Sequence, residues 1–191
     1  MSTNAGYEDD AENLIEAYES YDFHAIHGPH LHLFPTKPSK ILEVGAGTGR
    51  DARGLVDMGH EVWAVEPTQS FRSWAEEAHP SAKIHWLDDL LPKLSKVRQL
   101  GLNFDFVLSN AVWMHLDKDQ RRASLVTIAK VMNEGARLLL SFRYGPVPAG
   151  RRMFEVDIDD FLIAAAESKL ELIERINQEP GTDIFGRSNV S

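Results

Sequence analysis

Residues 41–50 read ILEVGAGTGR, and this stretch decides the fold. Its first four residues are apolar except for Glu43, and glycines then occupy three alternate positions: Gly45, Gly47 and Gly49. A helix-like run over residues 51–58 comes next and ends at Gly59. A buried strand, a tight glycine turn and the start of a helix are typical of a nucleotide-binding crossover. The free N–H groups at the helix N-terminus can bind an anionic group of a ligand.

The spacing of these glycines argues against a dinucleotide. The fingerprint G-x-G-x-x-G has its third glycine three residues after the second, and Arg50 occupies that position here. A second predicted strand, residues 61–65, is followed directly by Glu66. A carboxylate at the end of that strand can accept hydrogen bonds from both hydroxyls of a ribose.

With these features the stretch resembles the class I S-adenosylmethionine (SAM)-dependent methyltransferases, whose first motif reads acid-apolar-G-x-G-x-G. The resemblance covers most of residues 41–176 and is specific to the cofactor, not to the substrate. It implies SAM as cofactor and an α/β fold. That fold is a doubly wound, Rossmann-like, mostly parallel sheet with helices on both faces.

The resemblance also implies a partner for each part of SAM. The glycine-turn amides meet the amino-acid head, and Glu66 takes the ribose hydroxyls. Asp88 accepts from the adenine amino group beside Asp89, although a solvated turn is the alternative for this pair. Backbone carbonyls after the fourth strand face the ammonium group. The predicted cofactor-binding residues are Glu43, Gly45, Ala46, Gly47, Gly49, Arg50, Asp51, Glu66, Pro67, Asp88, Asp89, Ser109 and Asn110.

Strands alternate with helices along the rest of the chain, which by itself predicts a doubly wound parallel sheet. Ligands of such sheets bind at the carboxyl ends of the strands, where the acidic and polar residues above lie. The predicted strands are residues 41–44, 61–65, 83–87, 104–109, 137–142 and 170–176. The main predicted helices are residues 8–21, 51–58, 70–79, 117–132 and 157–168.

The end of the chain departs from the family's sheet, which has a seventh, antiparallel strand between strands five and six. Here the chain stops at Val190 and Ser191, where the seventh strand ought to begin. We expect a six-stranded sheet with the seventh strand missing or incomplete, in a truncated form of a longer protein or in a variant of the family sheet. An open edge invites pairing with another chain, so both a monomer and a homodimer fit.

Length and composition place the chain among globular proteins of one domain. We expect residues 1–40 to form a helical lid or cap and residues 41–191 the SAM-binding domain; a helix packed on the sheet edge is the alternative to the lid. The net charge of −9 disfavours nucleic acid as a partner. There is no cysteine and no apolar run of membrane-spanning length, and residues 1–10 lack the basic and apolar regions that are typical of a signal peptide. This pattern favours a cytoplasmic protein.

Four histidines lie close together in the sequence, which raises the question of a metal site: His24, His27, His30 and His32. Gly28 and Pro29 break the segment, and no Asp, Glu or Cys stands between the histidines to complete a ligand set. We therefore predict no metal site, but a short helix that ends near Gly28.

The fourth strand is followed by the sequence SNAVWMHL, which lacks the Asn-Pro-Pro-aromatic motif of amino-methylating DNA and RNA enzymes. The chain resembles more closely the small-molecule branch of the class. His115 is the candidate base, or alternatively a helix-start histidine bonded to backbone. Trp113 is either a wall of the acceptor site or part of the core.

A basic group after the fifth strand stands out in this acidic chain. Arg143 and Tyr144 are candidate catalytic residues there, and Arg151 with Arg152 extends the group across a proline-containing loop. These side chains can hold a carboxylate or phosphate of an anionic acceptor. Solvent-exposed charge is the alternative.

Three functional classes follow from these features. The first is a methyltransferase that acts on a small molecule, whose identity and acceptor atom the sequence leaves open. The second is a module that binds SAM or S-adenosylhomocysteine without turnover. The third, a nicotinamide-dependent oxidoreductase, is disfavoured by Arg50 at the third glycine position.

Overall fold

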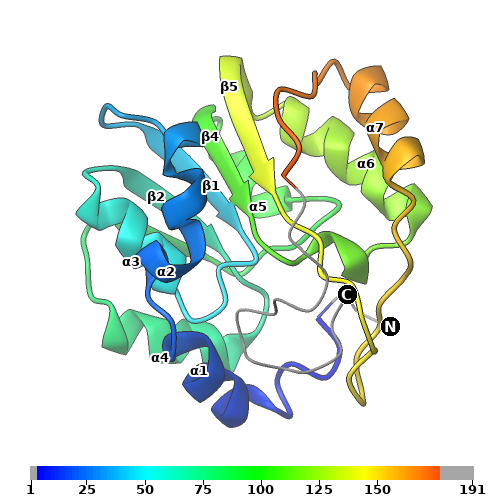
Figure 1. The fold of residues 1–191 in the computed structure, drawn as a ribbon. Helices are drawn as coiled ribbons and strands as arrows, with labels where there is room; N and C mark the ends of the chain where they lie inside the picture. Colours follow the sequence, from blue (N-terminus) through cyan, green and yellow to red (C-terminus); the bar gives the residue numbers. More distant parts are fainter. Residues whose placement is uncertain (1–3, 177–191) are drawn as a thin grey trace.

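A five-stranded, all-parallel sheet lies between two layers of helices in the computed structural model, which describes residues 4–176 (Figure 1). The strand order is β3-β2-β1-β4-β5, so the chain starts in the middle and winds outward in both directions. The predicted doubly wound fold is confirmed. The strands are β1 (Lys40–Val44), β2 (Glu61–Val65), β3 (Ile84–Leu87), β4 (Phe104–Ser109) and β5 (Met132–Leu140).

Alternate side chains of each strand enter two separate cores, as the pleat requires. Leu42 of β1 joins the core under α5, α6 and α7, whereas Ile41 joins the core under α2 and α3. Buried strands of this kind read as near-continuous apolar runs. The helices of the main body are α3 (Arg50–Asp57), α4 (Gln69–Ala78), α5 (Ser95–Gln99), α6 (Lys118–Ala129) and α7 (Ile158–Glu167), with a 3-10 turn η2 (Trp113–His115).

The N-terminal segment folds as α1 (Ala11–Glu19), α2 (Phe23–His27) and a 3-10 turn η1 (Gly28–Leu33). The Asp22 carboxylate caps α2 by accepting from Ala25 N–H at 2.7 Å. The Phe23 ring is buried in the core under α3 and lies directly against Gly54. The predicted short helix ending near Gly28 is therefore present, and it is packed on the body of the molecule.

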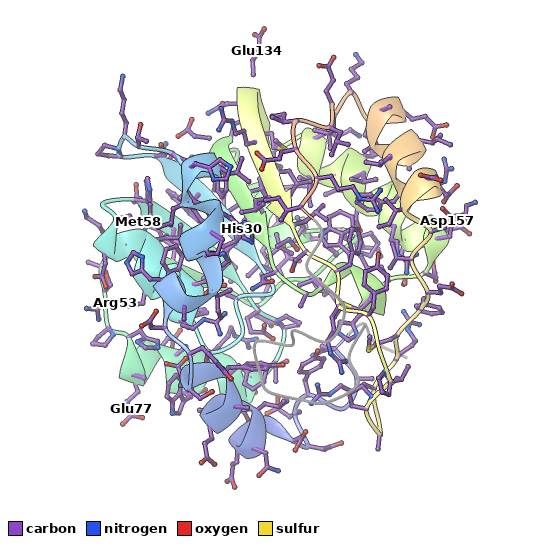
Figure 2. All side chains as sticks on the ribbon, in the orientation of Figure 1. His30, Arg53, Met58, Glu77, Glu134 and Asp157 are labelled. Atoms are coloured by element: carbon purple, nitrogen blue, oxygen red, sulfur yellow. The ribbon has the colours of Figure 1, made fainter. Side chains whose placement is uncertain are left out.

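The structure corrects the predicted start of the fifth strand: residues 133–135, which the sequence leaves as a turn between the predicted helix 117–132 and the predicted strand 137–142, form part of a strand. These residues lie inside β5, which starts at Met132, and the pairing of β4 with β5 shifts register between Phe104 and Phe106. The register shift accommodates the extra residues, and Glu134 points away from the molecule (Figure 2). The sequence prediction failed because a glycine within a strand marks a β-bulge as readily as a glycine outside it marks a turn.

The predicted sixth strand, residues 170–176, is wrong. No strand forms there, and the sheet of residues 4–176 has five strands, with β5 at one edge. Leu172 and Ile173 are 59% and 71% exposed, so their apolar character does not report a buried strand. The pattern of apolar residues indicates an extended chain, but it does not reveal whether a neighbouring strand is present to form the hydrogen bonds of a sheet. The position expected for the seventh strand lies outside the described residues.

Gly54 yields a test of how the N-terminal segment is attached. A Cβ at Gly54 would overlap the Phe23 ring, whereas a Cβ at Gly28 would meet nothing within 4 Å. We expect Gly54→Ala to lower the melting temperature, because overpacking costs about 1–3 kcal/mol and outweighs the helix preference of alanine. Gly28→Ala is the control and should change it little. Thermal unfolding, followed by circular dichroism, compares the melting temperatures of the two variants. An unchanged melting temperature of Gly54→Ala would contradict the close packing of Phe23 against Gly54.

Candidate active site

A cavity of about 370 Å³ opens at the carboxyl ends of the strands. The glycine turn after β1 and the end of β2 form its floor, and the loops after β3, β4 and β5 form its sides. Residues of α1 and of the segment before it complete the wall. The volume lies in the range of small-molecule sites.

The three glycines of the turn have positive φ angles, but only one of them faces open space. A Cβ at Gly45 would overlap Val112, and one at Gly49 would lie 2.8 Å from the Trp86 ring. A Cβ at Gly47 would meet only Tyr18, at 3.7 Å. Gly45 and Gly49 are thus required by packing, whereas the missing side chain at Gly47 leaves room for a ligand.

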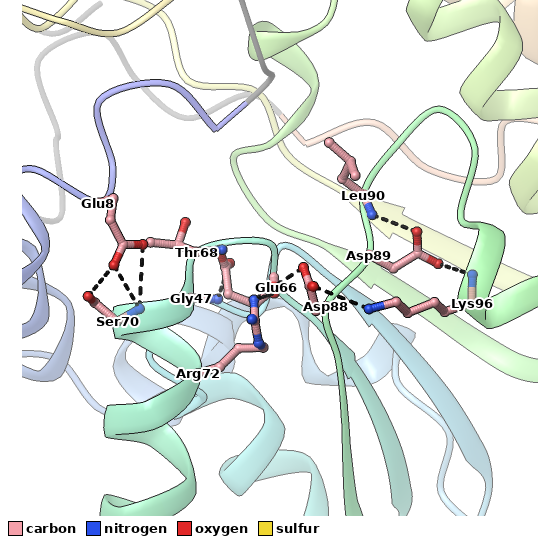
Figure 3. Close-up of polar contacts among 10 residues, drawn as sticks. All are labelled: Glu8, Gly47, Glu66, Thr68, Ser70, Arg72, Asp88, Asp89, Leu90 and Lys96. Atoms are coloured by element: carbon pink, nitrogen blue, oxygen red, sulfur yellow. Dashed lines mark hydrogen bonds and ion pairs between the residues drawn. The ribbon is translucent and has the colours of Figure 1, made fainter.

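The Glu66 carboxylate lies at the floor of the cavity and is 6% exposed. Its Oε2 accepts from Gly47 N–H at 2.9 Å, and its Oε1 accepts from Thr68 N–H at 2.8 Å (Figure 3). Burial raises the pKa of Glu66, although the bonds from Thr68 and Gly47 and the Arg72 charge oppose the rise. Each oxygen keeps a further lone pair for a ligand hydroxyl.

The sequence favours Asp88 over Asp89 as the residue at the cavity, and the structure shows the reverse placement. Asp89 is buried, lines the cavity and caps α5, accepting from four backbone N–H groups at 2.7–3.1 Å. Asp88 is half exposed and pairs with Lys96 at 3.2 Å and with Arg72 at 3.5 Å (Figure 3). Asp89, and not Asp88, therefore lines the cavity.

A second group of buried charges lies beneath the glycine turn. The Asp51 carboxylate pairs with His27 Nε2 at 3.0 Å and with Arg50 Nε at 2.8 Å. Burial would raise the pKa of Asp51, but these two partners outweigh burial and hold it well below its usual range. Glu43, 3% exposed, has no such partner; burial and the Asp51 charge raise its pKa well above the usual value. Its Oε2 makes no hydrogen bond.

The same charges attach the N-terminal segment to the site. Arg50 donates from Nη1 to the Tyr18 carbonyl at 3.0 Å, at the cavity side of α1. Glu8 accepts from Ser70 N–H at 3.2 Å at the start of α4 (Figure 3). His27, one of the four clustered histidines, is occupied by Asp51. Within residues 4–176 no three His, Asp or Glu side chains are placed to hold a metal ion.

The opposite end of the cavity is basic and contains His115. His115 Nδ1 lies 2.7 Å from the Arg152 carbonyl, and Nε2 lies 2.8 Å from the Tyr7 hydroxyl. Arg143 and Arg151 also line this end. Burial lowers the pKa of His115, the three arginine charges lower it further, and the Arg152 carbonyl opposes them. The imidazole is therefore neutral near pH 7.

Most of the predicted site residues meet at this cavity. Ser109 does not line it, because its Oγ donates to the Val44 carbonyl at 3.3 Å and accepts from Trp113 Nε1 at 3.0 Å. Trp113 is fully buried, which supports its interpretation as core. Tyr144 is 42% exposed and also lies outside the lining. The predicted residues that line the cavity are Glu43, Gly45, Ala46, Gly47, Arg50, Asp51, Glu66, Pro67, Asp89, Asn110, His115 and Arg143.

Two residues of the cavity wall, Tyr7 and Met153, are not among those predicted from the sequence. Both line the cavity, yet Tyr7 precedes α1 in a polar stretch and Met153 lies in an irregular loop. Neither position has a periodic pattern or a motif around it. A lone aromatic residue just before an amphipathic helix was the one available signal for Tyr7, and it is a weak signal.

Sequence comparison identifies relatives of this chain. A family model described as a methyltransferase domain matches residues 42–140. An uncharacterized methyltransferase of Alkaliphilus oremlandii is 24% identical over 154 residues, which cover 78% of this chain and 66% of that protein. One from Bacillus cereus is 24% identical over 101 residues, covering 53% and 45%. The matches thus span about half to two thirds of these relatives.

Solved structures show the same fold. A TehB-like SAM-dependent methyltransferase from Corynebacterium glutamicum superposes with a TM-score of 0.65 at 23% identity, covering 84% of this chain and 83% of that one. The glycopeptide N-methyltransferase MtfA, complexed with SAM, gives a TM-score of 0.63 at 16% identity, covering 88% of this chain and 91% of that one.

No helix within residues 4–176 is long and apolar enough to cross a membrane.

The unpartnered Glu43 carboxyl predicts how stability depends on pH. Its pKa is higher in the folded state, so folding binds a proton and stability falls as pH rises above about 4.3, the ordinary value. Glu43→Gln removes the titrating carboxyl and should therefore abolish this loss, so the variant should gain stability relative to the parent protein as pH rises toward neutral.

Melting temperatures between pH 4 and pH 8 test this expectation. The advantage of Glu43→Gln should grow with pH and approach zero near pH 4. Glu77→Gln is the control, because Glu77 is exposed on α4 and points away from the molecule (Figure 2). An advantage that does not vary with pH would contradict the raised pKa.

Proposed function

This chain belongs to the methyltransferase domain family, and from that premise we propose that it transfers a methyl group from SAM to a small, anionic acceptor. The observation that carries the proposal is the buried Glu66 carboxylate beside the open side of Gly47, at the floor of the cavity. A carboxylate there suits two ribose hydroxyls, and the empty Cβ position suits the cofactor's close approach.

The charges along the cavity support SAM as the ligand of the acidic end. Glu43, Glu66 and Asp89 line this end, and both the sulfonium and the ammonium group of SAM are cations. The deprotonated form of Glu43 becomes favourable when a cation lies nearby. Solved relatives that are named as SAM-dependent or as complexed with SAM have the same fold.

The basic end supports an anionic acceptor. Arg143 and Arg151 line the cavity, and Arg152 lies behind His115, in a chain whose net charge is −9. Guanidinium groups bind carboxylates and phosphates through paired hydrogen bonds. The cavity then separates its two ligands by charge, with the cationic cofactor at one end and the anionic acceptor at the other.

Methyl transfer from a sulfonium is a displacement with a good leaving group, and the protein contributes alignment and exclusion of water. The methyl carbon moves from sulfur to a lone pair of the acceptor, and the sulfur keeps the electrons of the broken bond. A base is needed where the acceptor atom also carries a proton.

Two measurements test the proposal. Calorimetry should detect binding of SAM and S-adenosylhomocysteine and no binding of NAD. Incubation with methyl-labelled SAM and a metabolite extract should then yield a labelled product that an anion-exchange resin retains. Binding without any labelled product would identify a binding module instead, and binding of NAD alone would exclude both functions.

Gly47 allows a sharper test of the cofactor site. We expect Gly47→Ala to weaken SAM binding at least tenfold, because the new methyl group enters the cavity. Gly135→Ala is a matched control: its φ is +77°, compared with +55° at Gly47, and its Cβ would meet nothing within 4 Å. Both variants carry the strain of a positive φ, so equal SAM affinities in calorimetry would exclude the glycine turn as the site.

A further inference from the structure

Both ring nitrogens of His115 are already engaged. A carbonyl oxygen can only accept, so the contact of Nδ1 with the Arg152 carbonyl at 2.7 Å requires the proton on Nδ1. In a neutral imidazole Nε2 then has a lone pair, and it accepts from the Tyr7 hydroxyl at 2.8 Å. An acceptor molecule in the cavity therefore does not reach the base directly; Tyr7 stands at the reactive nitrogen.

Tyr7 is held firmly in this position. The Arg151 guanidinium lies 4.4 Å from the centre of its ring, and Phe71 packs against it edge-on at 6.1 Å between ring centres. The His115 ring is nearly perpendicular to it, at an interplanar angle of 87°. Arg151 itself pairs with Asp10 at 3.0 Å. Packing on several sides fixes the hydroxyl between His115 and the cavity.

The protonation states suit a proton transfer through this contact. Burial raises the pKa of Tyr7, the nearby Tyr18 and Glu66 raise it further, and Arg151 opposes them. The pKa of His115 is lowered by burial and by the surrounding arginines. Near pH 7 the tyrosine is therefore protonated and the imidazole is neutral, so the hydroxyl has a proton to give and the imidazole has a lone pair to receive it.

We propose that Tyr7 is the residue that takes the acceptor's proton, and that it passes its own proton to His115. This inference rests on the proposed methyltransferase function. As the methyl group bonds to the acceptor atom, the acceptor's proton moves to the Tyr7 oxygen, and the Tyr7 proton moves to His115 Nε2. The acceptor atom keeps the electrons of its former bond to hydrogen. The resulting imidazolium keeps its Nδ1–H bond to the Arg152 carbonyl.

The proposal gives the N-terminal segment a chemical role. Tyr7 and His115 are 108 residues apart in the sequence, and Tyr7 reaches the cavity only because the segment before α1 lies across it. A complete site then requires this segment in place. Proton acceptance is thereby linked to closure of the cavity, which also excludes water.

The test uses Tyr7→Phe, His115→Gln and the double variant, with His24→Gln as the control for an exposed histidine. We expect label transfer from SAM to the extract to fall about 10²–10⁴-fold in either single variant, the usual contribution of a proton-accepting group. SAM affinity should stay unchanged. The double variant should be no slower than the slower single variant, because the two residues act as one unit.

Two further measurements distinguish proton transfer by Tyr7 and His115 from a purely structural role. In the parent protein the transfer rate should fall as pH drops through the lowered pKa of His115, below about 6.5, and stay level above neutral pH. Both single variants should lose this fall. Long-range ¹H–¹⁵N NMR should find the His115 proton on Nδ1 in the parent protein.

The outcomes distinguish the proposed proton transfer through Tyr7 and His115 from the methyltransferase function on which that proposal rests. Label transfer in Tyr7→Phe within threefold of the parent rate would overturn the role of Tyr7 and leave the methyltransferase proposal standing. A His115 proton on Nε2 would also overturn the pair. Failure of the parent protein to bind SAM would overturn the function itself, and the pair with it.

Discussion

The Val65 carbonyl holds the turn after β1 in place by accepting from Gly45 N–H at 2.8 Å and from Ala46 N–H at 3.0 Å. These two bonds extend the pairing of β1 with β2 beyond the end of the strands. They bring the turn beside Glu66, whose carboxylate then accepts from Gly47 N–H. The floor of the cavity and the start of α3 both depend on this short stretch of backbone.

Electrostatics divides the cavity into two halves that suit different ligands. The acidic half contains Glu43, whose carboxyl is buried without a partner and disfavours the folded state at neutral pH. Such unfavourable groups are typical of functional sites, where a ligand supplies the missing charge. The basic half contains His115, whose pKa is lowered first by burial and then by the surrounding arginine charges, so that its imidazole is neutral near pH 7.

The N-terminal segment forms part of the cavity wall. It is attached through the core by Phe23, through ion pairing by His27 with Asp51, and across the cavity by Tyr7. Arg50 and Asp51, which the sequence suggests as ligand-binding residues, use their side chains for this attachment. Both residues also line the cavity at the start of α3.

The sequence by itself determined the parallel α/β fold, the glycine turn and the acid after β2, because each depends on local patterns: apolar runs, glycine spacing and strand–helix alternation. It did not determine which residues meet from distant parts of the chain. Asp89, and not Asp88, lines the cavity, because its carboxylate caps the start of α5. Residues 170–176 form no strand, because no neighbouring strand pairs with them. Only the tertiary structure brought Tyr7 to His115, because contacts between distant segments depend on packing that no local pattern encodes.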